Sequence, residues 1–120
     1  MDIKSRILAA DDLISETVTI PEWDNVKVRV RSLTGGEVAD LVKNSGVGKT
    51  LDPGSYSELL LAAALRDPET NERIFTDDEA SELSKKSAAV FMRLVEIAQG
   101  LNEVSNFNIA EGKADSEANQ

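Results

Sequence analysis

A stretch that begins at Asp67 carries oxygen-bearing side chains at the spacing of a calcium-binding loop. Asp67, Glu69 and Asn71 occupy alternate positions, and Asp78 stands at the twelfth. Such a loop also needs Gly at its sixth position, for a sharp turn, and a bidentate Glu at its twelfth. This chain has Glu72 at the sixth position and the shorter Asp side chain at the twelfth. We therefore predict a turn followed by a helix start, and no metal site.

Residues 46–50, GVGKT, match the last part of a phosphate-binding P-loop. The complete motif needs another Gly five residues before Gly48, where this chain has Lys43. It also needs a buried strand before the loop and a helix directly after it, whereas here a helical pattern comes first and LDPG follows. We predict a loop that binds neither a nucleotide nor any other cofactor.

The chain has no cysteine and no histidine. This excludes thiol nucleophiles, disulfides, zinc sites built from thiolate or imidazole, and the commonest general base. The remaining Ser, Lys and carboxylate side chains show no spacing that singles out an activated nucleophile or an acid–base pair. We predict that the protein is not an enzyme.

Acidic residues outnumber basic ones by 22 to 13, which gives a net charge of -9 at pH 7. This balance opposes general binding to nucleic acid or anionic membranes, because both carry dense negative charge. The longest apolar run, Leu59–Leu65, is too short to span a bilayer. The N-terminus carries aspartates where a signal peptide needs an unbroken apolar run. We expect a soluble intracellular protein that binds neither nucleic acid nor membrane.

The elements that position these residues begin with a predicted β-hairpin. Residues 17–20 are strand formers and residues 26–31 alternate strictly between apolar and basic side chains, with PEWDN between the two segments. The valines of the second segment can share one apolar face. We interpret its three cations as a solvated strand face; the alternative is a contact with phosphate or with an acidic partner.

Helical patterns dominate the rest of the chain. Thr34 with Glu37, and Thr76 with Glu79, form capping boxes that mark two helix starts. The predicted helices span residues 35–43, 55–65, 76–83 and 85–101.

These patterns predict a mainly helical α+β fold with a small N-terminal β-hairpin followed by a helical bundle. We expect one domain over residues 1–104. Residues 105–120 are polar and acidic and lack periodicity, which predicts a disordered tail.

The predicted helix at residues 85–101 has a wider apolar face than one packing seam requires. Its two adjacent apolar stripes span about half of the circumference, at roughly 100° per residue. We hypothesise that Phe91, Met92 and Val95 contribute to self-association or to the binding of another protein. The alternative is that all three side chains belong to the core.

Ile3, Ile7 and Ile14 lie on one stripe of a short predicted helix at the N-terminus, because they follow helical spacing. One interpretation is a helix that docks on the core, as ordinary amphipathic helices do. The other is an arm whose isoleucines bind another chain. On that second interpretation the three isoleucines are candidate partner-binding residues.

Residues 18–37, VTIPEWDNVKVRVRSLTGGE, resemble an N-terminal signature of tail assembly chaperones from long-tailed bacteriophages and related prophages. In that signature a Pro-Glu-Trp precedes a short basic strand and a Leu-Thr helix start. Residues 64–102 are similar to the later part of the family, where an Asp-containing turn and an Ile-Phe-Thr-Asp lead into a long helix. Relatives often place Gly in the turn, where this chain has Asn71 and Glu72. Asn tolerates a left-handed backbone, so the turn can still form.

The resemblance covers roughly residues 18–104. It implies a non-enzymatic protein that binds the tape-measure protein and keeps it soluble while tail-tube subunits polymerise around it. It also implies a homo-oligomer that acts in the host cytoplasm during assembly and is absent from the mature virion. In many relatives a ribosomal frameshift yields a longer form that recruits the tail-tube protein, and the short acidic tail here would be the unshifted ending.

Two other classes of function are compatible with the sequence. A structural tail or head–tail component would be retained in the virion. A small acidic regulator or nucleic-acid mimic would order its carboxylates along one surface and compete with DNA for a host protein.

Overall fold

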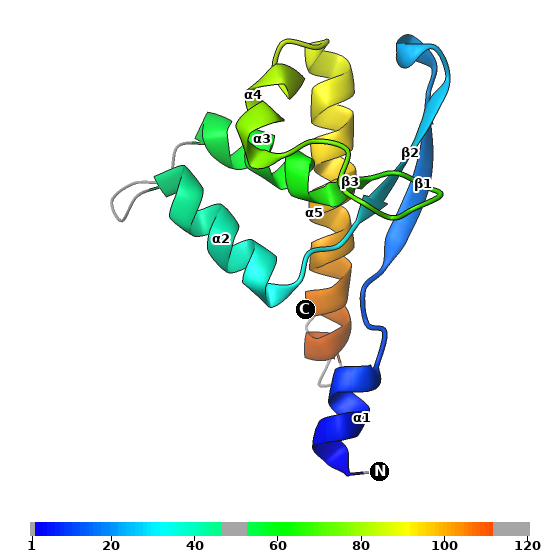
Figure 1. Cartoon of the computed structure of the whole chain (residues 1–120), viewed down its shortest axis with the longest axis vertical. Coiled ribbons are helices and arrows are strands. Elements are labelled where there is room, and N and C mark those ends of the chain that lie inside the picture. The colour runs from blue at the N-terminus through cyan, green and yellow to red at the C-terminus, as the bar shows by residue number, and fades with distance from the viewer. Residues whose placement is uncertain (1, 47–52, 112–120) are drawn as a thin grey trace.

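The computed structural model describes the backbone of residues 2–46 and 53–111 and the side chains of residues 2–45 and 55–103. The elements follow in the order α1 (Ile3–Ala9), β1 (Ser15–Ile20), η1 (Pro21–Trp23), β2 (Val26–Arg31), α2 (Gly35–Gly46), α3 (Pro53–Ala64), β3 (Leu65–Arg66), η2 (Asp77–Glu79), α4 (Ala80–Leu83) and α5 (Ala88–Glu111). Helices α2, α3, α4 and α5 lie on one side of a small three-stranded sheet (Figure 1), so the predicted mainly helical α+β fold is confirmed.

Strands β1 and β2 form the predicted antiparallel hairpin, in which Val18 lies opposite Val28. Two residues in the turn, Asp24 and Asn25, have φ angles of 60° and 58°. Asp and Asn tolerate this left-handed conformation better than most residues, so the sequence chemistry suits the turn. The hairpin's apolar face packs on the helices of the same chain, because Val28 and Val30 belong to the common core.

A third strand, β3, extends the sheet on the other side of β2, with Leu65 opposite Val30 and Arg66 opposite Arg29. The sequence predicts helix through residue 65, but α3 ends at Ala64. A strand of two residues is too short to show an alternating pattern of apolar and polar side chains in the sequence. Only their pairing with the free edge of β2 makes them a strand.

Helix α3 lies at the centre of the fold, where it contacts α2, α4, α5 and β2 (Figure 1). Every residue from 60 to 66 is buried. Leu61 and Leu65 from this segment are wholly buried with Val90 and Leu94 from α5. The sheet and the helices therefore share one hydrophobic core.

Helix α1 stands apart from this core. Figure 1 shows it projecting from the body at the end of an extended linker, and none of its residues is buried. Asp2 caps the helix, since its carboxylate accepts a hydrogen bond of 2.8 Å from the backbone N–H of Ser5. The backbone becomes extended at Ala10. The helix therefore does not dock on the core, and the binding of another chain by its isoleucines stays a prediction.

Helix α5 continues through Glu111, so the domain boundary that the sequence predicts at residue 104 does not coincide with the end of this helix. No Pro or Gly occurs between Leu101 and Glu111. Extending an existing helix costs less free energy than nucleating a new one, so residues of moderate helix propensity can continue α5 beyond residue 104. The remainder of the predicted tail, residues 112–120, lies outside the described part of the chain.

Candidate functional site

The three candidate residues on α5 do not form one surface. Val95 is buried, and Phe91 is half-buried against the core. Met92 is 52% exposed, because it lies on a different side of the helix. The structure thus places Phe91 and Val95 with the core, the alternative stated for them, and leaves Met92 at the surface.

The three candidate isoleucines lie along the arm. Ile3 and Ile7 on α1 are 71% and 66% exposed, and Ile14, just before β1, is 37% exposed. Leu8 is 77% exposed and joins them, although it lies outside the stripe that the sequence pattern selects. The sequence could have indicated Leu8 as a further candidate, because it directly follows Ile7.

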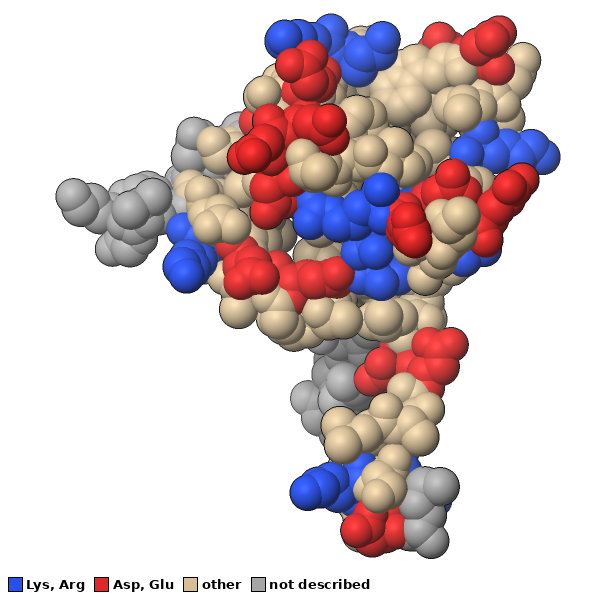
Figure 2. Space-filling model, viewed as in Figure 1, with Lys and Arg blue, Asp and Glu red and all other residues tan. Residues whose placement is uncertain are grey.

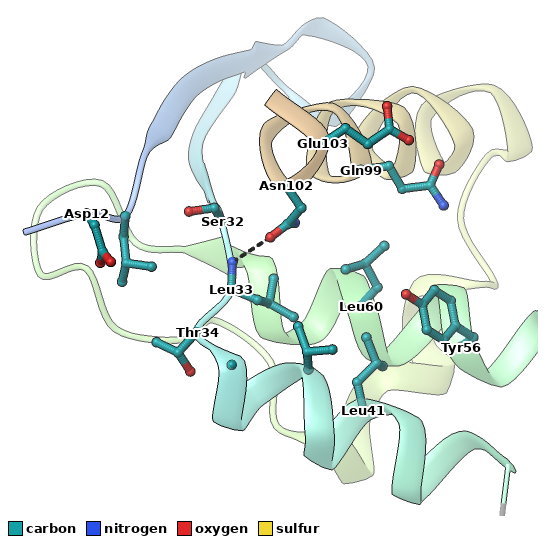
Figure 3. A pocket seen from close by; sticks show the side chains of 13 residues that line it. Asp12, Ser32, Leu33, Thr34, Leu41, Tyr56, Leu60, Gln99, Asn102 and Glu103 are labelled. Carbon is teal, nitrogen blue, oxygen red and sulfur yellow. Dashed lines mark hydrogen bonds between the residues drawn. The ribbon is translucent and has the colours of Figure 1, made fainter. Parts of the chain in front are cut away.

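A groove opens beside the base of the arm, between α2, α3 and α5 (Figure 3). Its volume is about 720 Å³, within the range of roughly 300–1,000 Å³ that is typical of ligand pockets. Its apolar lining comes from Leu13, Leu33, Val38, Leu41, Tyr56 and Leu60. The sequence does not predict this groove, because its walls come from segments that are far apart along the chain.

Asn102 holds one wall of the groove in place. Its side-chain oxygen accepts a 3.0 Å hydrogen bond from the backbone N–H of Leu33 (Figure 3), and its side-chain nitrogen donates one of 2.8 Å to the carbonyl of Ala98. The amide therefore joins α5 to the segment that enters α2. At the other side of that segment, the hydroxyl of Ser32 accepts a hydrogen bond from the backbone N–H of Ile14.

Two carboxylates border the groove. Figure 3 shows Asp12 on one side and Glu103 on the other. Neither forms an ion pair with another of the described side chains. The groove therefore combines an apolar floor with an acidic rim.

An ion-pair cluster lies at the start of α2, where the carboxylate of Glu37 accepts hydrogen bonds from Arg31 and, at 2.9 Å, from Arg66. Figure 2 shows how basic and acidic groups gather side by side on one face of the molecule. Burial raises the pKa of Glu37, but the hydrogen bonds from Thr34 and Arg31 and the charges of Arg31 and Arg66 outweigh it. The pKa of Glu37 consequently lies below its ordinary value. Every member of the cluster is engaged in holding α2 to the sheet.

The contacts of Arg29 and Arg31 differ from the solvated strand face that we inferred for residues 26–31. Arg31 is half-buried and paired with Glu37. Arg29 is half-buried too, and its guanidinium donates to the carbonyl of Pro68 at 3.1 Å. The prediction of a solvated face is wrong for these two residues, because the neighbouring loop and α2 supply oxygen acceptors that strand periodicity cannot reveal.

The calcium-like stretch forms the predicted turn. The carboxylate of Asp67 accepts hydrogen bonds from the backbone N–H groups of Glu69 and Thr70 at 2.8 and 3.3 Å, and Asn71 adopts a φ of 64°. The capping box of Thr76 and Glu79 is also present. Asp67 therefore shapes the backbone of its own turn.

Two other expectations concern metals and nucleotides. In the described ranges, no group of three or more Asp and Glu side chains is arranged to hold a metal ion. Residues 47–50 of the P-loop-like stretch lie outside the described part of the chain.

Among the described helices, none combines the length and the apolar character that crossing a bilayer requires.

Residues 2–118 match the sequence profile of a protein family described as phage tail assembly chaperone. The chain belongs to this family. The match confirms the resemblance seen in residues 18–37 and 64–102, and it extends over the arm. No match was found among curated proteins.

A solved tail assembly chaperone has a similar fold. The structure of the bacteriophage HK97 tail assembly chaperone matches with a TM-score of 0.58 and 24% sequence identity. The match covers 83% of this chain and 98% of the HK97 chain. At this identity the likeness concerns the fold.

As a tail assembly chaperone, the protein presents two kinds of candidate surface. One is the exposed apolar side of α5 around Met92, and the other is formed by the arm and the neighbouring groove. The ion-pair cluster around Glu37 joins α2 to the sheet.

Proposed function

We propose that this tail assembly chaperone binds the tape-measure protein of its phage, keeps it soluble and helps tail-tube subunits to polymerise around it. The observation that carries the proposal is membership of the tail assembly chaperone family over residues 2–118. The protein acts without catalysis or a cofactor, in the host cytoplasm during assembly, and is absent from the mature virion. It works as a homo-oligomer, and a frameshift-extended form brings in the tail-tube protein.

The exposed side of α5 supports a contact with an apolar helix of the client. Met92 is flexible and polarizable, so it adapts to differently shaped apolar partners. Ala88 and Ala89, one turn earlier on the helix, are exposed as well. This small apolar patch, residues 88, 89 and 92, lies on a protein whose net charge of -9 favours the solubility of a complex.

Co-expression with the tape-measure protein of the same phage tests the proposal. We expect the tape-measure protein in the soluble fraction only when the chaperone is present, and we expect the two to co-elute in size-exclusion chromatography. Met92→Glu should lower the soluble yield of the client. Ser81→Glu, which adds the same charge at an exposed position on α4, should not lower it.

Three outcomes would contradict parts of the proposal. If the tape-measure protein precipitates with the wild-type chaperone, client binding by this form is wrong. If Met92→Glu and Ser81→Glu behave alike, the patch is not the contact. If mass spectrometry finds the chain in purified virions at a fixed ratio to the tube protein, the alternative of a structural tail or head–tail component is correct.

A further inference from the structure

Strand β1 lies at the edge of the sheet. The strand order is β1-β2-β3, and within the described part of the chain β1 pairs with β2 alone. Figure 1 shows the hairpin at one side of the molecule, away from α2. The side chains of residues 15–17 and 19 are exposed. The outer edge of β1 is therefore accessible to another chain.

The register of the hairpin shows which backbone groups point out of this edge. The carbonyl of Ile14 accepts a hydrogen bond of 2.8 Å from the backbone N–H of Ser32, which directly follows β2. Backbone groups alternate in direction along an antiparallel strand, so every second residue from Ile14 onward faces β2. The residues between them point their N–H and C=O groups outward: Ser15, Thr17 and Thr19. In the described ranges, no hydrogen bond outside the hairpin involves these three residues.

Strand β1 lacks the features that usually keep an edge strand from pairing. Proteins protect such edges with lysine, with proline, with a bulge or by making the strand very short. This strand has 6 residues, contains neither Lys nor Pro, and pairs with β2 without a bulge. Its length is that of an ordinary strand, about 5–6 residues. The edge is therefore suited to accept one more strand, which is the recognition mode called β-augmentation.

The side chains of β1 specify the kind of strand that would fit. Residues directly opposite each other on neighbouring strands share a face and contact each other. Val18 is half-buried, so a β-branched apolar side chain opposite it would cover its exposed part. Glu16 is exposed and forms no ion pair with another described side chain. A Lys or Arg opposite Glu16 would supply the missing counter-charge.

A second copy of β1 would fit this edge poorly. If two copies paired antiparallel with Thr17 opposite Thr17, Glu16 of each copy would lie opposite Val18 of the other. That register leaves both carboxylates without a cation. With Thr19 opposite Thr19, Pro21 would lie opposite Thr17, and Pro has no N–H to donate. The edge therefore favours a different protein over another copy of this chain.

We propose that the open edge of β1 binds an extended segment of another protein as an additional antiparallel strand. The strands of this sheet already run antiparallel to their neighbours, and antiparallel pairing is slightly more stable than parallel pairing. The bound segment alternates β-branched residues, with a Lys or Arg opposite Glu16 and a Val or Ile opposite Val18. The site consists of different residues from the Met92 patch, and the proposal does not depend on tape-measure binding.

A synthetic peptide tests the site on the full chain. Aligned antiparallel with residues 15–20, the peptide Val-Thr-Val-Thr-Lys-Thr places its Lys opposite Glu16 and its second Val opposite Val18. In an NMR titration, we expect the peptide to shift the amide resonances of Thr17 and Thr19, whose N–H groups it engages. The same peptide with Glu in place of Lys should bind about threefold more weakly, because like charges would lie opposite each other. Glu16→Lys should reverse the order of the two peptides.

A proline at the centre of the edge tests the backbone contact. Thr17→Pro removes an N–H that the fold does not use, and proline is tolerated in an edge strand where this side faces solvent. It should weaken binding of the Lys peptide by about tenfold, because one intermolecular hydrogen bond is lost. Thr17→Val keeps the N–H and the strand propensity, so it should bind as wild type does. Circular dichroism checks that both variants are folded.

Three results would overturn the proposal. The first is an absence of amide shifts in β1 at millimolar peptide. The second is equal binding of the Lys peptide by Thr17→Pro and Thr17→Val, or equal binding of the two peptides by both wild type and Glu16→Lys. The third is a lower mass of Thr17→Pro than of wild type in light scattering, since this would show that the edge pairs with another copy. The tape-measure protein is absent from these experiments, so their failure would leave the proposed function to the co-expression test.

Discussion

Glu22 in the hairpin turn and Arg93 on α5 form a two-point contact across 71 residues of sequence, with hydrogen bonds of 2.7 and 3.2 Å between guanidinium and carboxylate. The hydrogen bond from Arg93 lowers the pKa of Glu22 from 4.5 to about 2, and a backbone hydrogen bond assists. Both side chains are partly exposed, so salt screens the pair. The contact ties the far end of the hairpin to the helix that carries the Met92 patch.

This contact predicts an acid-dependent difference between wild type and Glu22→Gln. Because the folded pKa of Glu22 lies below its ordinary value, its contribution to stability is complete above pH 4.5 and is lost as the pH falls toward 2. Urea unfolding should show wild type slightly more stable than the variant at pH 7 and low salt, with the difference shrinking between these pH values. A difference that is constant with pH would contradict this linkage.

Replacing Glu37 should destabilise the fold more than replacing an exposed glutamate. Glu37→Gln removes the charge that neutralises Arg31 and Arg66, the latter with a side chain only 10% exposed. We expect a loss of about 2 kcal/mol in the free energy of unfolding, from the broken ion pairs and a weakened capping box. Glu96→Gln on the wet side of α5 is the control and should stay within about 0.5 kcal/mol of wild type. Equal effects of the two variants would show that the cluster contributes nothing.

Truncating Val95 to alanine should lower the free energy of unfolding much more than truncating Met92. Val95→Ala opens a cavity beside the core and should cost about 2 kcal/mol in the free energy of unfolding, because the side chain is only 4% exposed. Met92→Ala should change the same quantity by less than about 0.5 kcal/mol. Chemical denaturation measures both. A large loss with Met92→Ala would mean that this side chain packs within its own chain.

Asn102→Ala should loosen the wall of the groove. It removes the acceptor for the backbone N–H of Leu33, a residue that is 8% exposed, and an unpaired buried N–H costs roughly 1–3 kcal/mol. Native-state hydrogen exchange should show faster exchange at Leu33, while amides in β1 change little. Unchanged exchange at Leu33 would indicate that water replaces the side chain without loss.

The elements that the sequence predicted are those whose signal is local. Alternation in residues 26–31 indicated a strand, and the boxes of Thr34 with Glu37 and of Thr76 with Glu79 marked helix starts, because a few neighbouring residues supply all the interactions involved. The order of these local signals also carried the family resemblance, which the family match confirms.

Contacts between segments that are distant in sequence could be seen only in the tertiary structure. The strand pairing of Arg66 with Arg29, the hydrogen bond of Asn102 to Leu33 and the groove all depend on the path of the chain between their parts. A helical pattern could likewise show that the face of the 85–101 helix was wide, but not that packing would bury Val95 and leave Met92 outside. The sequence by itself determined local conformation and family, because both depend on the types and order of neighbouring residues. The tertiary structure decided which side chains remain exposed to another chain, because burial depends on segments that are distant in sequence.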